Sequence, residues 1–325
     1  MCSALLFKNP ETPEESEEIG RYVGSTWDGV NDPPDAEGIY RYASQQILYV
    51  KTFVENSEVI IEARTGKPLR EADTPAMAND SAYSADLDET VGLFAEDSAS
   101  IVCALLYVAR STRLDALFAV CRMTRYLTKW MRRQDMWLIR CVGYLKRTMN
   151  MKLNYAIYPP DFEEGGDGEF ENWADADLGG DKVAKRSTSG GCGFLKGSKS
   201  RALVHAHCKR QGQTGISTPE TETVAMVVLG KKTIPLHLIA IRSLKRALKL
   251  SYKGDNTASE RVIGTGMSQA LAYLKRTAGL SLKWAHDNMS EFLERTPTDA
   301  NISDIFTKPL EREKFEHFRT LLGIY

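Results

Sequence analysis

The chain has 325 residues, which is long enough for two domains that each bury a core of their own. Its 42 lysines and arginines nearly balance its 43 aspartates and glutamates, and the net charge of -1 excludes a protein that attracts nucleic acid by an overall basic field. The six cysteines have no C-x-x-C spacing, which excludes a disulfide framework and a paired-cysteine zinc site, so we expect an intracellular protein, cytoplasmic or nuclear.

The character of the chain changes near residue 38. Residues 1–38 are acidic and interrupted by prolines, a composition that predicts a leader or a disordered segment. The pattern then favours a strand at 39–42 and an amphipathic helix at 44–54, whose apolar residues share one face. Residues 65–90 contain many small polar residues and are expected to form a loop.

A long helical tract is predicted over residues 99–151, and its second part is strongly basic. Between Arg122 and Arg147 the sequence contains many lysines and arginines and a single acidic residue, Asp135. Such a stretch can lie along a phosphate backbone, and a solvated helix face explains it equally well. The candidate phosphate-binding residues are Arg122, Arg125, Lys129, Arg132 and Arg133.

A stretch rich in proline, glycine and acid, 159–168, is predicted to be a linker between a region at 39–158 and a C-terminal domain at 169–325. Three closely spaced strands open this domain, at 169–174, 187–195 and 202–209. The short glycine-rich or Gly-Ser turns between these strands predict an antiparallel meander.

The meander is followed by a helix-start signal at Ser217. Glu220 stands three residues later, which is the spacing of a capping box, and Pro219 lies near the first helical position. The helix is predicted to run from about Pro219 to Leu229. Gly230 and Pro235 should then break or kink it, with helix resuming to about residue 247. No stretch approaches the roughly 20 apolar residues of a membrane-spanning helix, so we expect no membrane partner.

The rest of the domain alternates between strands and helices. We predict a fourth strand at 248–255, helical segments between 257 and 287, a fifth strand near 291–296 and terminal helices at about 301–322. The expected fold class is α/β, with a mixed five-stranded sheet flanked by helices, and the order of elements is that of the ribonuclease H fold.

Four acids of this domain stand where an active site could collect them. Asp175 ends the first strand, Glu222 lies near the start of the capped helix, Asp255 ends the fourth strand and Asp304 follows the fifth. If the first and fourth strands are parallel neighbours, the strand ends that carry Asp175 and Asp255 are adjacent. A ligand set made only of oxygen favours magnesium or manganese, and two such ions about 4 Å apart serve hydrolysis of phosphodiesters. Each acid taken alone is more typical of a solvated surface.

Residues 171–325 resemble the ribonuclease H domain of copia-type LTR retrotransposon Pol polyproteins. The motifs that carry the resemblance are Asp175-Ala176-Asp177 with Gly180-Asp181 and 185–190; Lys209-Arg210-Gln211 with 217–222; Asp255-Asn256-Thr257-Ala258; and 301–310. The resemblance implies two Mg²⁺ or Mn²⁺ ions, metal-binding and catalytic roles for Asp175, Glu222, Asp255 and Asp304, and hydrolysis of the RNA strand of an RNA/DNA hybrid. Asn256 is a candidate contact to that substrate, whose 2′-hydroxyl groups distinguish RNA from DNA.

Residues 39–158 resemble the end of a reverse transcriptase palm and its mainly helical thumb or connection region. The polymerase needs a Tyr-X-Asp-Asp motif, and no two adjacent aspartates occur in the sequence. We therefore expect no polymerisation by this chain alone. Other parts of a retroelement polyprotein are further candidate partners.

Two departures from the family pattern affect the nuclease interpretation. Gly254 stands before Asp255 where the family places bulkier residues, which predicts a looser strand end. Arg295 lies roughly where many ribonucleases H carry a histidine that helps product release. These departures keep a second hypothesis open, in which the chain is a catalytically inert nucleic-acid-binding remnant of a retrotransposon.

Overall fold

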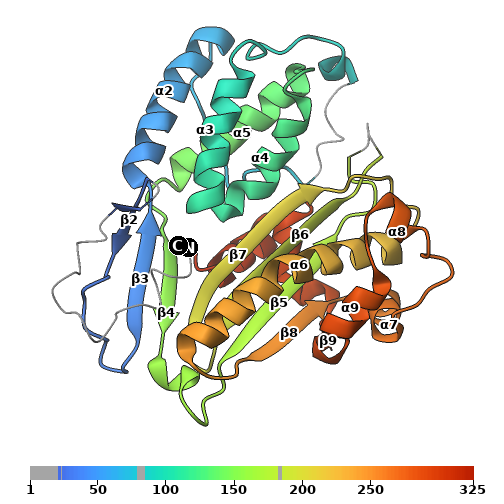
Figure 1. Ribbon diagram of the computed structural model, residues 1–325. Coiled ribbons are helices and arrows are strands. Elements are labelled where there is room, and N and C mark those ends of the chain that lie inside the picture. Colours follow the sequence, from blue (N-terminus) through green and yellow to red (C-terminus); the bar gives the residue numbers. More distant parts are fainter. Residues whose placement is uncertain (1–20, 23, 79–84, 182–184) are drawn as a thin grey trace. The chain divides into compact units, whose positions relative to one another are not determined.

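The computed structural model describes residues 21–22, 24–78, 85–181 and 185–325 (Figure 1). These residues form two compact units. The sheet unit consists of Gly29–Tyr42 and Tyr155–Thr307, and the helical unit consists of the described part of Gly20–Asp28, Ala43–Asn154 and Lys308–Tyr325. The C-terminal helix therefore belongs to the helical unit, whereas the sequence pattern placed it with the C-terminal domain.

A mixed sheet forms the centre of the sheet unit, as predicted. Its strands, in spatial order, are β7 (Arg201–Arg210), β6 (Thr188–Lys196), β5 (Glu169–Ala176), β8 (Lys249–Gly254) and β9 (Leu293–Arg295). The first three strands in the chain form an antiparallel meander, β8 is parallel to β5, and β9 is parallel to β8. The order and pairing of these strands confirm the predicted α/β fold with a ribonuclease H order of elements. The predicted count of five strands is too low, because the described residues form one nine-stranded sheet in which these five are consecutive.

Helix α6 (Thr218–Leu244) lies along one face of this sheet (Figure 1) and packs on β5 and β6. The ring of Phe170 on β5 lies 5.9 Å from the ring of His237 on α6, measured between centroids. Between β8 and β9 the chain forms α7 (Thr257–Thr265), α8 (Leu274–Thr277) and α9 (Leu282–Met289). The turn η7 (Ile302–Phe306) packs against β5 and β6.

The predicted break in this long helix is wrong, because α6 continues through Gly230 and Pro235. A Cβ atom on Gly230 would collide with Met289 of α9, so this glycine allows close packing between helices. Pro235 removes one backbone N–H, but both Pro235 and Lys231, four residues earlier, are exposed, and water can bind the released carbonyl. The expectation that no stretch approaches a membrane-spanning helix is wrong by length and composition, because α6 is, among the described residues, the one helix long and apolar enough to cross a membrane. Its buried residues pack on the sheet.

The segment 159–168, expected to be a linker, belongs to the sheet unit. Its first residues form the turn η4 (Pro159–Phe162), and the carboxylate of Asp161 accepts hydrogen bonds from the hydroxyl of Ser198 at 2.6 Å and from the amide of Ser200 at 2.8 Å. Asp161 thereby fixes the β6–β7 turn, and η4 and this turn form one local structure. The preceding strand β4 (Leu153–Ile157) pairs with β7 at Ala156 and Arg201.

The helical unit replaces the predicted tract at 99–151 with three separate helices and short turns. Its helices are α2 (Ile47–Thr65), α3 (Ser98–Ser111), α4 (Leu117–Met123), α5 (Arg132–Arg147) and α10 (Arg312–Leu321), with the 3-10 turns η1 (Ala85–Asp88), η2 (Leu114–Ala116) and η3 (Thr124–Tyr126). The interpretation of residues 1–38 as leader or disordered fails for 21–22 and 25–28, which form β1 (Arg21–Tyr22) and β2 (Ser25–Asp28), because β1 pairs with β2 and β2 pairs with β3 (Tyr40–Gln45). Residues 1–20 lie outside the described part of the chain.

A buried ion pair holds the helical unit together. The guanidinium of Arg113 contacts the carboxylate of Asp115 at 2.8 Å, and both side chains are at most 1% exposed. The hydroxyl of Tyr144 donates to the same carboxylate, while Arg113 donates to the carbonyl of Thr148 at 2.9 Å. Burial disfavours the charge of Arg113, but Asp115 and Tyr144 together more than offset this effect and raise the pKa of the guanidinium.

Candidate metal centre

Three of the four predicted acids come together at one edge of the sheet. Asp175, Glu222 and Asp255 each offer a carboxylate oxygen, and these oxygens all lie within 4.8 Å of one another. Asp175 is 2% exposed and Glu222 is 8% exposed, while Asp255 is half-buried. Sequence reasoning thus identified all three members of the group.

The parallel pairing of β5 and β8 explains why these residues meet. Trp173 pairs with Lys253, so both strands reach the same edge, where Asp175 lies near the end of β5 and Asp255 directly follows β8. Glu222 is on the first turns of α6, whose start lies at that edge. The chain places its acids at the carboxyl ends of parallel strands, where open α/β sheets bind their ligands.

Gly254 has a packing role that the sequence did not reveal. A Cβ atom at this position would lie 2.9 Å from the Cε atom of Met226 on α6. Gly254 is buried, so the strand end is in close contact with the helix.

Two residues of the motif at 301–310 fix the end of β5 that carries Asp175 through hydrogen bonds. The hydroxyl of Thr307 donates to the carboxylate of Asp175, and the side-chain amide of Asn301 donates to the carbonyl of Ala174 at 2.9 Å. Both residues are buried and both belong to the motif at 301–310. The motif itself was visible in the sequence, but Asp304 was the one residue of it to which the sequence analysis gave a functional role.

That acid, Asp304, is not among the carboxylates within 4.8 Å of one another. It is 1% exposed in η7, and its carbonyl accepts a hydrogen bond from the amide of Thr307 at 3.1 Å. The turn η7 packs closely under β6, since a Cβ atom on Gly190 would lie 3.1 Å from the carbonyl oxygen of Ser303. Asp304 therefore lies within the packed layer beneath the sheet.

The remaining acids near this edge have local structural roles. Asp177 accepts a hydrogen bond from the amide of Thr188, and Asp181 pairs with Arg210 at 3.2 Å. The capping box is not formed as predicted, because Glu220 accepts from the amide of Ile216 at 2.7 Å and Ser217 makes no side-chain cap. 

Asn256, the candidate substrate contact, caps α7. Its side-chain oxygen accepts a hydrogen bond from the amide of Ser259 at 2.9 Å. The same helix carries Glu260, which sequence reasoning did not single out. Burial raises the pKa of Glu260, the charge of Arg295 opposes this shift and that of Asp255 adds to it, so these side chains interact electrostatically with one another.

The five basic candidates lie in the helical unit. Arg122 stacks over the ring of Trp137 at 3.7 Å, Arg132 lies 3.7 Å from Asp135, and Arg133 pairs with Asp88 at 2.5 Å. Lys129 is exposed and Arg125 is half-buried. Several of these residues therefore have local partners within their own unit.

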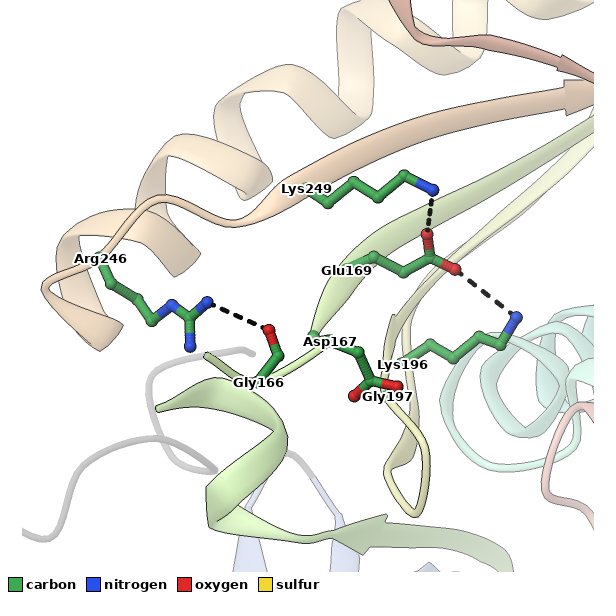
Figure 2. Close-up of a pocket in the computed structure, with 8 residues that line it drawn as sticks. Gly166, Asp167, Glu169, Lys196, Gly197, Arg246 and Lys249 are labelled. Carbon is green, nitrogen blue, oxygen red and sulfur yellow. Dashed lines mark hydrogen bonds and ion pairs between the residues drawn. The ribbon is translucent and has the colours of Figure 1, made fainter. Parts of the chain in front are cut away.

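A separate cavity of about 450 Å³ lies at the other end of β5. Figure 2 shows Glu169 between Lys196 and Lys249, with Arg246 directed toward the carbonyl of Gly166, 3.5 Å away. Glu169 begins the strand and Asp175 is near its end, so the cavity is about 20 Å from the carboxylate group at roughly 3.3 Å per residue. The cavity is therefore separate from the cluster of carboxylates formed by Asp175, Glu222 and Asp255.

The carboxylate group suits a hard divalent cation. Its donors are all oxygen, as Mg²⁺ and Mn²⁺ prefer, and three negative charges at this separation repel one another unless a cation lies between them. The donor set therefore fits the ions that the resemblance implies.

No protein-family model matches the chain. The chain is 25% identical over 236 residues to the retrovirus-related Pol polyprotein from transposon TNT 1-94 of Nicotiana tabacum, a match that covers 70% of this chain and 16% of that polyprotein. The chain thus matches about one sixth of the length of this relative.

Solved structures of ribonuclease H domains were also matched. The RNase H1 of the archaeon Halobacterium salinarum is 12% identical with a TM-score of 0.32, over 43% of this chain and 95% of that one. The N-terminal RNase H domain of Rv2228c from Mycobacterium tuberculosis is 10% identical with a TM-score of 0.32, over 47% and 97% of the two chains. The strand order and pairing described above carry the assignment of the fold. The chain is thus similar in sequence to part of a retrotransposon Pol polyprotein, and its sheet unit has the strand order and pairing of the ribonuclease H-like fold.

Proposed function

We propose that the sheet unit is a divalent-metal-dependent nuclease that hydrolyses the RNA strand of RNA/DNA hybrids. The observation that carries this proposal is the group formed by Asp175, Glu222 and Asp255, whose oxygens lie within 4.8 Å of one another at the edge where β5 and β8 end. A ribonuclease H-like fold with such a group at this edge is suited to phosphodiester hydrolysis.

In this proposal Asp175, Glu222 and Asp255 hold two Mg²⁺ or Mn²⁺ ions. When bound, the ions would activate a water molecule and stabilise the charge on the leaving oxygen. The water adds to phosphorus and the bond to the 3′ oxygen breaks, so the products are a 3′-hydroxyl and a 5′-phosphate. Thr307 keeps one carboxylate in place through its hydroxyl group.

Substrate contacts follow from the same assignment. The oxygen of Asn256 is used in capping α7, so its amide nitrogen is the group that would reach a 2′-hydroxyl of the RNA strand. We assign binding of the hybrid's phosphates to Arg122, Arg125, Lys129, Arg132 and Arg133. Their contribution would weaken as the salt concentration rises, because counterions compete for the phosphates.

One observation favours a second candidate function. Asp304 lies outside the carboxylate group, which leaves three acids where the resemblance implied four. A chain with a weakened metal centre could still bind hybrids through its basic residues. This candidate is a nucleic-acid-binding protein without turnover.

A cleavage assay separates the two candidates. Purified protein is incubated with Mg²⁺ and an end-labelled RNA/DNA hybrid, alongside Asp175→Asn, Asp255→Asn and the control Asp177→Asn. Asp177 is close in sequence but binds the amide of Thr188, a bond that asparagine can still accept. We expect the first two variants to lose more than about a hundredfold in rate, and the control to cleave like the wild type. If the wild type were as inactive as Asp175→Asn while still shifting the hybrid on a gel, the nuclease assignment would be wrong.

A further inference from the structure

Six charged side chains form a closed ring of alternating sign across four strands of the sheet. Each carboxylate contacts two lysines and each lysine contacts two carboxylates. In ring order the members are Glu169, Lys196, Glu171, Lys253, Glu294 and Lys249. We call this set the charge ring.

The two shortest distances in the ring are those made by Glu171. Glu171 lies 2.7 Å from Lys196 and 2.6 Å from Lys253. Glu169 at the far side is 3.5 Å from Lys196 and 3.3 Å from Lys249 (Figure 2). Glu294 completes the ring at 2.9 Å from Lys249 and 3.7 Å from Lys253.

The ring follows from strand register. Glu169 stands directly opposite both Lys196 and Lys249, and Lys253 stands opposite Glu294. Cross-strand neighbours of opposite charge stabilise a sheet, and here they link β6, β5, β8 and β9 in one network. Because alternate residues of a strand share a face, Glu171 lies on the same face of β5 as Asp175, opposite the face on which Phe170 meets α6.

The inner part of the charge ring, formed by Glu171 and Lys253, is shielded from solvent. The side chain of Glu171 is 1% exposed and that of Lys253 is 17% exposed, whereas that of Lys249 is 61% exposed. Glu171 also accepts a hydrogen bond from the indole of Trp173 at 2.8 Å, and the ammonium of Lys253 lies 5.0 Å above the ring of that tryptophan. An ion pair shielded from water in this way holds its geometry far better than an exposed one.

We propose that Glu171 and Lys253 are positioning residues, which lock the end of β8 against β5 and so set the separation of Asp175 and Asp255. Trp173 and Lys253 form the last registered pair before the two ligands, so a change there is transmitted directly to them. The role rests on the proposed function, because it assigns the ring to the metal centre of that nuclease. The role also explains the two residues that end this strand. Lys253 contacts Glu171 on β5, and Gly254 leaves room for the side chain of Met226 on α6.

Loss of the lysine has a defined consequence. Glu171 would keep its contacts with Lys196 on β6 and with Trp173, but it would lose its contact with β8. Its buried carboxylate would then link β5 to β6 and no longer to β8. Burial by itself would raise the pKa of Glu171, and the hydrogen bonds from its two lysines and the tryptophan lower it to about 2. This carboxylate is therefore charged at neutral pH and needs its cations.

The test compares three variants of the full chain. Lys253→Met removes the inner charge, Lys253→Arg keeps it, and Lys249→Met makes the matched change on the same strand at the exposed side of the ring. Mg²⁺ affinity is measured by titration calorimetry, kcat and KM by hybrid cleavage, and amide exchange by mass spectrometry on peptides that cover 169–176 and 249–255 in metal-free protein.

We expect Lys253→Met to weaken Mg²⁺ binding by about 10- to 100-fold, to lower kcat more than it raises KM, and to speed amide exchange at 172–176. Lys253→Arg should restore most of the affinity, and Lys249→Met should match the wild type. If Lys253→Met and Lys249→Met had equal effects on exchange and on affinity, the positioning role would be refuted.

The exchange measurement needs no metal, so it decides the positioning role even if the wild type fails to cleave hybrids. A wild type that binds no Mg²⁺ would instead count against the proposed nuclease.

Discussion

Asp115→Asn should be among the most damaging single changes in the helical unit. Asparagine keeps the shape of the side chain but removes the charge, which leaves the guanidinium of Arg113 buried without its carboxylate. Breaking a buried ion pair on one side costs about 3–5 kcal/mol. At about 1.4 kcal/mol per factor of ten, this loss should speed amide exchange in α5 by roughly a hundredfold to a few thousandfold. Exchange measured peptide by peptide isolates the helical unit from the sheet unit.

Asp88→Asn is the matched control, because Asp88 also pairs with an arginine, Arg133, at 2.5 Å in the same unit. The side chain of Asp88 is 53% exposed, so water and salt replace much of what the pair contributes. We expect a loss of at most about 1 kcal/mol. Equal exchange rates in α5 for the two variants would show that burial does not govern the strength of these pairs, and the reasoning would fail.

Three further predictions concern the sheet unit. The folded-state pKa of Glu171, about 2 against 4.5 for the free side chain, means that this carboxylate stabilises the fold above pH 4.5 and loses its contribution, about 3 kcal/mol, as the pH falls from 4.5 to about 2. Acid titration of urea unfolding checks this, and Glu171→Gln should remove that part of the pH dependence. Gly190→Ala would place its Cβ 2.7 Å from the Cβ of Phe306 and should cost about 1–3 kcal/mol in the free energy of unfolding; a melting temperature equal to that of the wild type would contradict the packing described for η7. Thr307→Val removes the hydroxyl group bound to the buried carboxylate of Asp175 with little change in shape. Mg²⁺ affinity should fall about 10- to 100-fold and the free energy of unfolding by about 1–3 kcal/mol, and calorimetry that gave the wild-type affinity would contradict the role of this hydroxyl.

The strands of the sheet unit could be predicted because their signals are local. Glycine-rich or Gly-Ser turns separate the stretches that became β5, β6 and β7, and the observed bounds differ from the predicted ones by one or two residues. The three acids of the metal centre followed from the same reasoning, since each stands at the end of a strand or the start of a helix. Parallel pairing of β5 with β8 was the one tertiary assumption required, and the register confirms it.

The errors occur where packing decides the outcome. Gly230 and Pro235 are helix breakers by local propensity, but contact with α9 and with the sheet keeps α6 continuous. The position of Asp304 likewise depends on the packing of η7 under β6, which no local pattern reports, and its role as a fourth ligand stays a prediction. The charge ring was equally invisible, because its members are spread over the sequence from Glu169 to Glu294 and meet only through strand register.

A close contact between β8 and α6 lies beside the three carboxylates. Met226 stands one turn beyond Glu222 on α6, and a Cβ atom at position 254 would lie 2.9 Å from its Cε atom. Because Cε is the end of a flexible side chain, a small residue at position 254 requires that end to shift while α6 stays in place. On the other side of β8, the ammonium of Lys253 contacts the carboxylate of Glu171 on β5 at 2.6 Å. Of these two adjacent residues, Lys253 therefore carries the proposed constraint on the separation of Asp175 and Asp255, whereas Gly254 affects the packing of Met226.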